Sequence, residues 1–306
     1  MPPLRIATRG SPLALWQARA VRVALAAADP ALAAPDAVEI VVVRTTGDRV
    51  QDRTLAAIGG KGLFTKEIEE ALLAGTADLA VHSMKDVPTV LPDGLVIDAM
   101  LPRADPRDAL VASVPGGLDG LKPGAVVGTA SLRRQAQILH RRPDLRVVPF
   151  RGNVDTRIAR LAAGEADATV LALAGLQRLG RDGVATEVLA AEVMLPAVAQ
   201  GAIGVERRAG DARTAALAGA IAHGPTMTAI AAERALLAVL DGSCRTPIAA
   251  LAELDGVGGL ALRALVAAPD GSALVATARA GSAAEPARIG SDAGAELAAR
   301  ATFLAR

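Results

Sequence analysis

The chain has few of the residues that form disulfides, metal sites and aromatic stacks. Cys244 is its only cysteine, which excludes a disulfide within the chain and a cysteine-based metal cluster. The three histidines, His82, His140 and His223, lie far apart in sequence and have no metal-ligand spacing. Tyrosine is absent, so stacking on a ligand ring must rely mostly on the few phenylalanines and on arginine faces. We therefore expect no bound metal.

An excess of charge of one sign and long apolar runs are also lacking. The formal net charge is +1, whereas nucleic-acid or membrane-surface partners would favour a basic excess. No apolar run reaches the ~18 residues of a membrane-spanning helix. The start of the chain, from Met1 to Arg5, lacks the apolar core of a secretory signal. These absences predict a soluble, cytoplasmic protein without nucleic-acid or membrane partners.

Lysine is scarce among the basic residues. Of the 33 lysines and arginines only Lys61, Lys66, Lys85 and Lys122 are lysines. Coding bias is one explanation, because the sequence is also rich in alanine and glycine. The other is that a guanidinium group matches a carboxylate in two places and stays charged at physiological pH. Both explanations can hold, so the positions of the arginines have to decide.

The first third of the sequence has the pattern of an α/β domain. At 306 residues with 52% hydrophobic content, the chain is long enough for two or three domains. Serine and proline at positions 11 and 12 supply a helix N-cap and first turn. Apolar periodicity predicts strands at Leu4 to Thr8, Val38 to Val43 and Asp78 to His82, and helices from Pro12 to about Ala28 and from Leu63 to Ala74. This alternation favours a largely parallel sheet.

A linker and two further domains follow. Prolines interrupt the pattern between Leu101 and Arg107, where we expect a linker. A second α/β domain is predicted from strands at Val126 to Thr129, Arg146 to Phe150 and Ala168 to Leu173 and helices at Ser131 to Arg142 and Val154 to Ala163. A long helix from Thr226 to Leu240, strand-like runs near Ile248, Leu260 and Leu274 and a helix near Asp292 predict a smaller α+β domain. Two similar α/β domains suggest a cleft between them, a common place for a small-molecule site.

Arginines recur where strands lead into helices. Thr129 to Arg134 places Ser131, Arg133 and Arg134 at a helix start, where backbone N–H groups and the helix dipole favour an anion. Each such motif alone is also compatible with an ordinary solvated helix start. The arrangement recurs, however, at Arg9 and Ser11, at Arg151 to Arg157 and, near the end of a short helical run, at Arg178.

These arginines should project toward the same edge of their sheets, where open α/β folds bind ligands. The implied ligand is a polycarboxylate or a phosphate. Gly59 to Gly62 lacks the upstream glycine and the following hydroxyl residue of a phosphate loop. The balance therefore favours carboxylates.

Two further segments could carry chemistry. Val81 to Pro88 follows a strand and is predicted as a loop at a sheet edge, with Lys85 beside Asp86. The alternative is a surface ion pair worth at most about 1 kcal/mol. Cys244 sits in a polar turn next to Arg245. A lone cysteine is commonly an inert small hydrophobe, but one in such a turn could be exposed with a lowered thiol pKa.

Six motifs follow one another along the chain: Arg5 to Arg9, Gly59 to Phe64, Val81 to Pro88, Ser131 to Arg134, Arg151 to Asn153 and Leu195 to Gly201. In this order they resemble the signatures of the hydroxymethylbilane synthase (porphobilinogen deaminase) family, and the resemblance covers nearly the whole chain. It implies a three-domain fold whose first two domains are like type II periplasmic binding proteins, with boundaries at 1–101 plus 200–220, 106–196 and 224–306. It also implies a monomer.

The same resemblance implies the cofactor, the substrate and the residues that hold them. A dipyrromethane cofactor would be attached to Cys244 by a thioether, and porphobilinogen would be the substrate. Asp86 is assigned the catalytic role, because a fixed carboxylate beside the pyrrole N–H groups would stabilise the cations formed when ammonia leaves and when the next pyrrole attacks. The resemblance assigns the cofactor to Lys85, Asp86, Ser131, Arg133, Arg134 and Arg157, the substrate to Arg9, Ser11, Arg151, Arg157 and Arg178, and a mobile loop over the cleft to Lys61 and Phe64.

Two other functions are compatible with parts of the sequence. A non-catalytic bilobed protein that binds a small anion would have the same two α/β domains, but would have no use for Cys244, and a secreted binder should carry a signal segment. A phosphate-transferring enzyme would need a phosphate loop and an acidic metal cluster, and neither is recognisable. A transferase that builds a linear tetrapyrrole is therefore the leading prediction.

Overall fold

A computed structural model describes residues 2–49, 62–240 and 246–305. Within these residues the chain forms two compact units. The first comprises residues 2–49, 62–104 and 201–227, and the second comprises residues 105–200, 228–240 and 246–305. The chain thus leaves the first unit after Ala104 and returns to it at Gly201.

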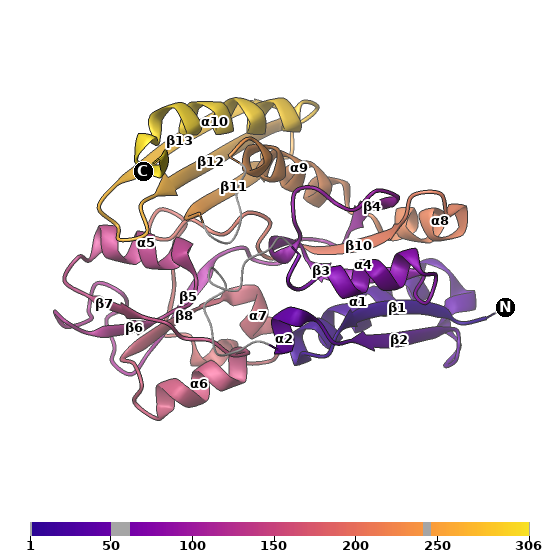
Figure 1. Cartoon of the computed structure of the whole chain (residues 1–306), viewed down its shortest axis with the longest axis horizontal. Helices are drawn as coiled ribbons and strands as arrows, with labels where there is room; N and C mark the ends of the chain where they lie inside the picture. The colour runs from indigo at the N-terminus through magenta and orange to yellow at the C-terminus, as the bar shows by residue number, and fades with distance from the viewer. Residues whose placement is uncertain (1, 50–61, 241–245, 306) are drawn as a thin grey trace. The chain divides into compact units, whose positions relative to one another are not determined.

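The first unit is built on a five-stranded sheet with the order β2-β1-β3-β10-β4 (Figure 1). β1 runs parallel to β2 and β3, whereas β10 is antiparallel to both β3 and β4. β10 therefore lies between strands that are more than one hundred residues earlier in the chain. The strands are β1 (Leu4–Arg9), β2 (Val38–Val43), β3 (Leu79–Ser83), β4 (Leu95–Met100) and β10 (Ile203–Arg208).

Helices cover both faces of this sheet. On one face Val21 and Leu25 of α1 pack with Leu4 and Ile6 of β1 and with Ala218 of α8. On the other face α4 packs against alanines of β1 and β3 through two buried aliphatic side chains. The helices are α1 (Pro12–Ala28), α2 (Thr46–Arg49), α4 (Lys66–Leu73) and α8 (Ala212–Ile221), with short 3-10 turns η1 (Pro30–Ala33) and η2 (Met84–Asp86).

The second unit contains a sheet with the same arrangement, in the order β7-β6-β8-β5-β9. β6 is parallel to β7 and β8, and β5 is antiparallel to β8 and β9, as β10 is to its neighbours in the first sheet. The strands are β5 (Asp108–Ala112), β6 (Val126–Gly128), β7 (Arg146–Val148), β8 (Ala168–Ala172) and β9 (Glu187–Val188). The helices are α5 (Leu132–Arg141), α6 (Val154–Ala162), α7 (Leu173–Arg178) and η3 (Asp182–Val184).

The second unit also holds a three-stranded antiparallel sheet, β11-β12-β13, with α10 along it (Figure 1). Gly290 of α10 lies so close to Ala232 O of α9 that a Cβ at this position would collide with it, so glycine lets the two helices touch. Leu251 and Leu265 of this sheet pack with Ala136 of α5. The elements are α9 (Gly224–Val239), whose residues up to Met227 belong to the first unit, β11 (Ile248–Leu254), β12 (Gly259–Ala267), β13 (Leu274–Ser282), α10 (Pro286–Arg300) and η4 (Thr302–Ala305).

The fold class predicted from the sequence, two α/β sheets with helices followed by a smaller α+β part, is confirmed. Residues 101–107 form neither helix nor strand, as expected of a linker. Two local predictions were wrong. The helix predicted from Leu63 begins at Lys66, after turns at 62–65. The strand predicted at Asp78 to His82 is present as β3, but the loop predicted from Val81 begins only after Ser83. The division into three domains remains a prediction.

In the described part of the chain no single helix is long and apolar enough to cross a membrane. Helices α8 and α9 together would reach that length and composition, but they are bent by 103° at the break between them.

Candidate active site

Four of the predicted site residues lie at one edge of the first sheet. β1 and β3 are parallel neighbours, so their carboxyl ends, Arg9 and Ser83, lie at the same edge. Ser11 follows β1, and Lys85 and Asp86 follow β3 in η2. This is the edge at which open α/β sheets bind ligands. The positions of Arg9, Ser11, Lys85 and Asp86 relative to the sheet thus match the sequence prediction.

Arg9 is stacked on an aromatic ring. Its guanidinium carbon lies 4.1 Å from the centroid of Phe64, which makes a cation–π contact. The turn that carries Phe64 is held by a hydrogen bond from Gly47 N to Leu63 O of 2.8 Å. A planar guanidinium stacked in this way has a defined orientation. Lys61, which was predicted on the same loop, lies outside the described residues.

The ends of α1 and β3 are tied together by side chains. Ser11 caps α1 by accepting a hydrogen bond of 3.2 Å from Ala14 N. Its hydroxyl proton can still be donated to an anion. Gln17 of α1 donates to Ser83 Oγ over 2.7 Å, which links the helix to the last residue of β3. This contact was not foreseen from the sequence.

Asp86 is half-buried between two buried apolar residues, Met84 and Val87. Met84 N donates to Ala202 O over 3.1 Å, so the backbone of η2 is anchored to the segment that leads into β10. Among the described residues, no hydrogen bond or ion pair engages the Asp86 carboxylate. A carboxylate held on an anchored backbone is thus available to cationic or N–H groups of a ligand.

A buried acidic group lies in the same unit. Glu69 of α4 is 7% exposed, and its Oε1 atom finds no hydrogen-bond partner in the described parts of the chain. Burial raises the pKa of Glu69 above its ordinary value of 4.5, and the neighbouring carboxylate of Glu206 raises it further, while His82 opposes the rise. His82 Nε2 lies 2.9 Å from Glu206 Oε2, so this pair sits between β3 and β10.

We expect Glu69→Gln to stabilise the protein at neutral pH. The folded protein holds the Glu69 proton more tightly than the unfolded chain does, so stability is lost as pH rises from about 4.5 through the raised folded value. A neutral glutamine removes that loss. Denaturant unfolding at pH values between about 4 and 8 should show a flatter profile than in the wild type. Glu70→Gln, on the exposed side of α4, is the control, and identical profiles for both variants would contradict the expectation.

The second sheet collects the remaining described site residues at the equivalent edge. β6, β7 and β8 are parallel, and they are followed by Ser131, Arg151 and the helix that ends at Arg178. Ser131 caps α5, since its Oγ accepts from Arg134 N over 3.4 Å. Gly152 has a φ of +120°, which only glycine adopts readily, and a Cβ there would collide with Thr156. This turn directs the chain from Arg151 into α6.

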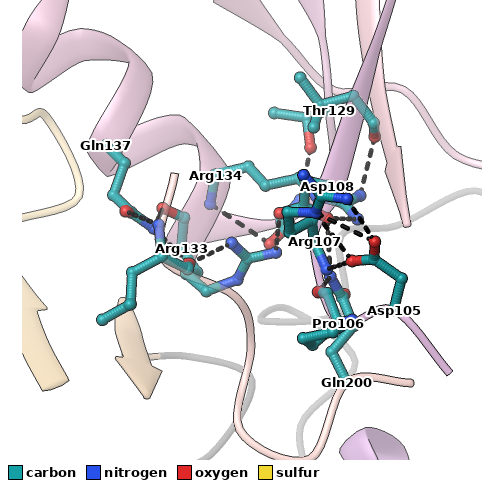
Figure 2. Close-up of polar contacts among 12 residues, drawn as sticks. Asp105, Pro106, Arg107, Asp108, Thr129, Arg133, Arg134, Gln137 and Gln200 are labelled. Atoms are coloured by element: carbon teal, nitrogen blue, oxygen red, sulfur yellow. Dashed lines mark hydrogen bonds and ion pairs between the residues drawn. The ribbon is translucent and has the colours of Figure 1, made fainter. Parts of the chain in front are cut away.

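Arg133 and Arg134 share an internal carboxylate, which Figure 2 shows. Each donates from Nη2 to Asp108 over 2.7 Å, and all three side chains are almost fully buried. Burial alone would raise the pKa of Asp108, but the two guanidinium groups hold it well below its ordinary value. The sequence assigned both arginines to ligand carboxylates and missed Asp108 altogether. Their role toward a ligand remains a prediction.

Arg157 is a cation with no carboxylate partner in the described residues. Its Nε donates to Gly152 O over 2.9 Å. Burial, together with the nearby cations Arg134, Arg151 and Arg160, lowers the pKa of Arg157 to about 10. Burial likewise lowers the pKa of Arg178 to about 10. An anion at this edge would relieve the repulsion, which is the electrostatic condition for a carboxylate site.

Arg160 is a cation that sequence reasoning overlooked. It stacks on Phe150 at 4.2 Å and pairs with Glu165 at 2.6 Å. Its position three residues after Arg157 on the same helix was the available signal. Cys244 lies outside the described residues. In the described segments no group of three or more histidine, cysteine or acidic side chains is placed to hold a metal.

Comparisons with known proteins agree with this chemistry. Residues 4–216 match the family model described as porphobilinogen deaminase, dipyromethane cofactor binding domain, and residues 227–299 match porphobilinogen deaminase, C-terminal domain. The porphobilinogen deaminase of Paracoccus denitrificans is 58% identical over 98% of this chain and 95% of its own. The chloroplastic porphobilinogen deaminase of Oryza sativa subsp. japonica is 53% identical over 97% of this chain and 84% of its own.

Solved structures give weaker similarities. The methionine-binding protein MetQ aligns with 72% of this chain and 90% of its own at 13% identity and a TM-score of 0.45. The VFT2 domain of BvgS from Bordetella pertussis aligns with 72% of this chain and 86% of its own at 17% identity and a TM-score of 0.43. At these values neither likeness bears on the ligand.

Proposed function

Because the chain belongs to the porphobilinogen deaminase family, we propose that it joins four porphobilinogen molecules head to tail on a covalently attached dipyrromethane and releases hydroxymethylbilane by hydrolysis. It is a transferase of tetrapyrrole biosynthesis with a dipyrromethane cofactor-binding domain. The covalent anchor is assigned to Cys244, and the protein is proposed to be cytoplasmic and monomeric. The proposed domains are 1–101 with 200–220, 106–196, and 224–306.

The environment of Arg157 is the observation that carries the proposal. Each pyrrole of the cofactor and of the product bears an acetate and a propionate, so a bound chain needs several cationic partners. Arg157 is half-buried beside other cations, and its pKa is lowered to about 10. A site of this kind favours a ligand with several carboxylates over a neutral one.

The donor set of this chain fits the cofactor. Guanidinium forks, an ammonium group and a capping hydroxyl are the groups that bind carboxylates. When bound, the dipyrromethane supplies the pyrrole carbon to which the first substrate is joined. The residues proposed to hold it are Cys244, Lys85, Asp86, Ser131, Arg133, Arg134 and Arg157, and those proposed for the substrate are Arg9, Ser11, Arg151, Arg157 and Arg178, with Lys61 and Phe64 on a loop over the site.

Asp86 is proposed as the catalytic residue. Loss of ammonia from porphobilinogen leaves a cation, and attack by the next pyrrole carbon produces a second one. The Asp86 carboxylate is free of hydrogen bonds and ion pairs with the described residues, so it can accept from pyrrole N–H groups. Its fixed negative charge stabilises both cations, and it can take up the proton that the ring releases.

Intact-mass spectrometry on the purified protein and on Cys244→Ser tests the proposal. We expect the wild type to carry an adduct of two pyrrole units, formed on incubation with porphobilinogen if the preparation is cofactor-free, and the variant to carry none. A wild type that never gains a pyrrole adduct would exclude the synthase, and the chain would then be an anion-binding protein. An adduct that persists in Cys244→Ser would place the anchor on another residue.

A further inference from the structure

Asp108 and Gln200 lie beside the two points at which the chain passes between its compact units. The chain enters the second unit at Asp105 and leaves it after Gln200. The amide of Gln200 donates from Nε2 to Pro106 O over 2.7 Å and to Asp108 Oδ1 over 2.9 Å. Gln200 is 1% exposed, so both bonds are made away from water. One amide group thus joins the incoming and the outgoing segment inside the second unit (Figure 2).

Asp108 connects this amide to the two adjacent arginines of α5. Its Oδ1 accepts from Arg134 as well as from Gln200, and its Oδ2 accepts from Arg133. Two cations and one anion leave a net charge of +1 in the cluster. Asp108 therefore accepts one hydrogen bond from each guanidinium group but neutralises only one of the two positive charges. The remaining positive charge can attract a ligand carboxylate.

The guanidinium groups are fixed from the other side by backbone carbonyls. Nη1 of Arg133 donates to Leu195 O, and Nη1 of Arg134 donates to Val170 O, each over 2.8 Å. Gln137 holds Leu195 in turn, since its Oε1 accepts from Leu195 N over 2.7 Å. With bonds at both ends, neither arginine can turn without breaking a buried contact. Such fixed donors bind a ligand without a further loss of side-chain freedom.

We infer that Asp108 and Gln200 are positioning residues, which hold Arg133 and Arg134 in the geometry that receives the cofactor carboxylates and link that geometry to the two segments between the units. The inference rests on the proposed function, in which these two arginines hold the dipyrromethane. Asp108 and Gln200 themselves touch other side chains and backbone of the protein. Substitution of Asp108 or Gln200 should therefore weaken the positioning of the bound pyrrole chain during elongation.

The test compares Asp108→Asn with the wild type in three measurements: the loaded fraction by intact mass, kcat and KM per loaded molecule, and the share of protein carrying one, two or three additional pyrrole units. We expect Asp108→Asn to load incompletely, and its loaded molecules to lose kcat by about a hundredfold and to stall at intermediate lengths. Thr169→Val is the control, because it removes a buried hydrogen bond to Gly128 O in the same sheet. It should lower thermal stability and leave kcat and the intermediates unchanged.

Gln200→Met keeps the inference testable if Asp108→Asn does not fold. It removes both amide bonds at similar volume without unbalancing the buried charge, and we expect a loss of kcat of about tenfold with the same stalling. Normal kcat and intermediates in loaded Gln200→Met, with only a lowered melting temperature, would overturn the inference. Failure of the wild type to gain any pyrrole adduct would instead reject the proposed function, so the two failures are distinguishable.

Discussion

Asp86→Asn is expected to give a folded protein whose turnover falls about a hundredfold. Removal of one preorganised electrostatic partner of a transition state typically costs about 3 kcal/mol, which corresponds to about two orders of magnitude in rate. Asparagine has the same size, and no hydrogen bond or ion pair with the described residues depends on the carboxylate. Met84 and Val87 remain buried on either side, so the backbone of η2 should keep its conformation.

The measurement is kcat and KM of purified, cofactor-loaded protein together with its thermal unfolding. Asp93→Asn is a suitable control, because it removes an exposed carboxylate seven residues further along the chain in the same unit. It should retain the activity of the wild type. If Asp86→Asn turns over as fast as Asp93→Asn, Asp86 has no catalytic role.

Local signals predicted the elements whose ends are encoded by neighbouring residues. Ser11 and the proline after it predict the start of α1, and the structure has the Ser11 cap with proline in the first turn. The apolar run from Val38 to Val43 coincides with β2. Leu63 and Phe64 look like helix residues, yet Gly62 has a φ of +83° and the turns at 62–65 delay α4. Hydrophobic periodicity does not report such a turn.

β10 and the cluster at Asp108 could not be read from local pattern. β10 carries Glu206 and Arg207 within a central strand, so it lacks the uniform apolar pattern of a buried strand. Glu206 is accommodated by His82, which is 124 residues away. Asp108 is likewise neutralised by arginines 25 and 26 residues later. An acidic residue at the start of an apolar strand indicates that a cationic side chain must pair with it. The local sequence does not identify which of the 29 arginines does so.

The positions of the arginines decide between the two explanations for their excess. Many pair with acidic residues at the surface, as Arg141 does with Asp119, and these are compatible with coding bias. Arg157 lies at the carboxyl edge of the second sheet without an acidic partner in the described residues, and coding bias alone gives no reason for a half-buried charge there. Recognition of ligand carboxylates accounts for Arg157, whereas coding bias is a sufficient explanation for the arginines that pair with surface carboxylates.

Arg157→Gln is expected to separate stability from function. Lowering the pKa of Arg157 from 12.5 to about 10 corresponds to about 3 kcal/mol of unfavourable charge burial. Because the folded pKa lies below the unfolded one, this cost is fully present at neutral pH and fades only as pH rises above about 10. The hydrogen bond from Arg157 to Gly152 O stabilises the folded state by about 1 kcal/mol and so offsets part of this cost. Without a ligand, removal of the charge should therefore stabilise the fold by about 1–2 kcal/mol.

In the catalytic assay the same substitution should be harmful. A hydrogen bond to a charged ligand group is worth about 1.5–3 kcal/mol, so kcat/KM should fall about tenfold to a hundredfold. Unfolding is measured in the Cys244→Ser background, where no cofactor compensates the charge, and kinetics in the otherwise unchanged protein. Arg160→Gln is the matched control, since Arg160 has Glu165 and Phe150 as partners and its loss should lower stability. If Arg157→Gln destabilises the cofactor-free protein as much as Arg160→Gln does, Arg157 is a structural residue, and the anion site lies elsewhere.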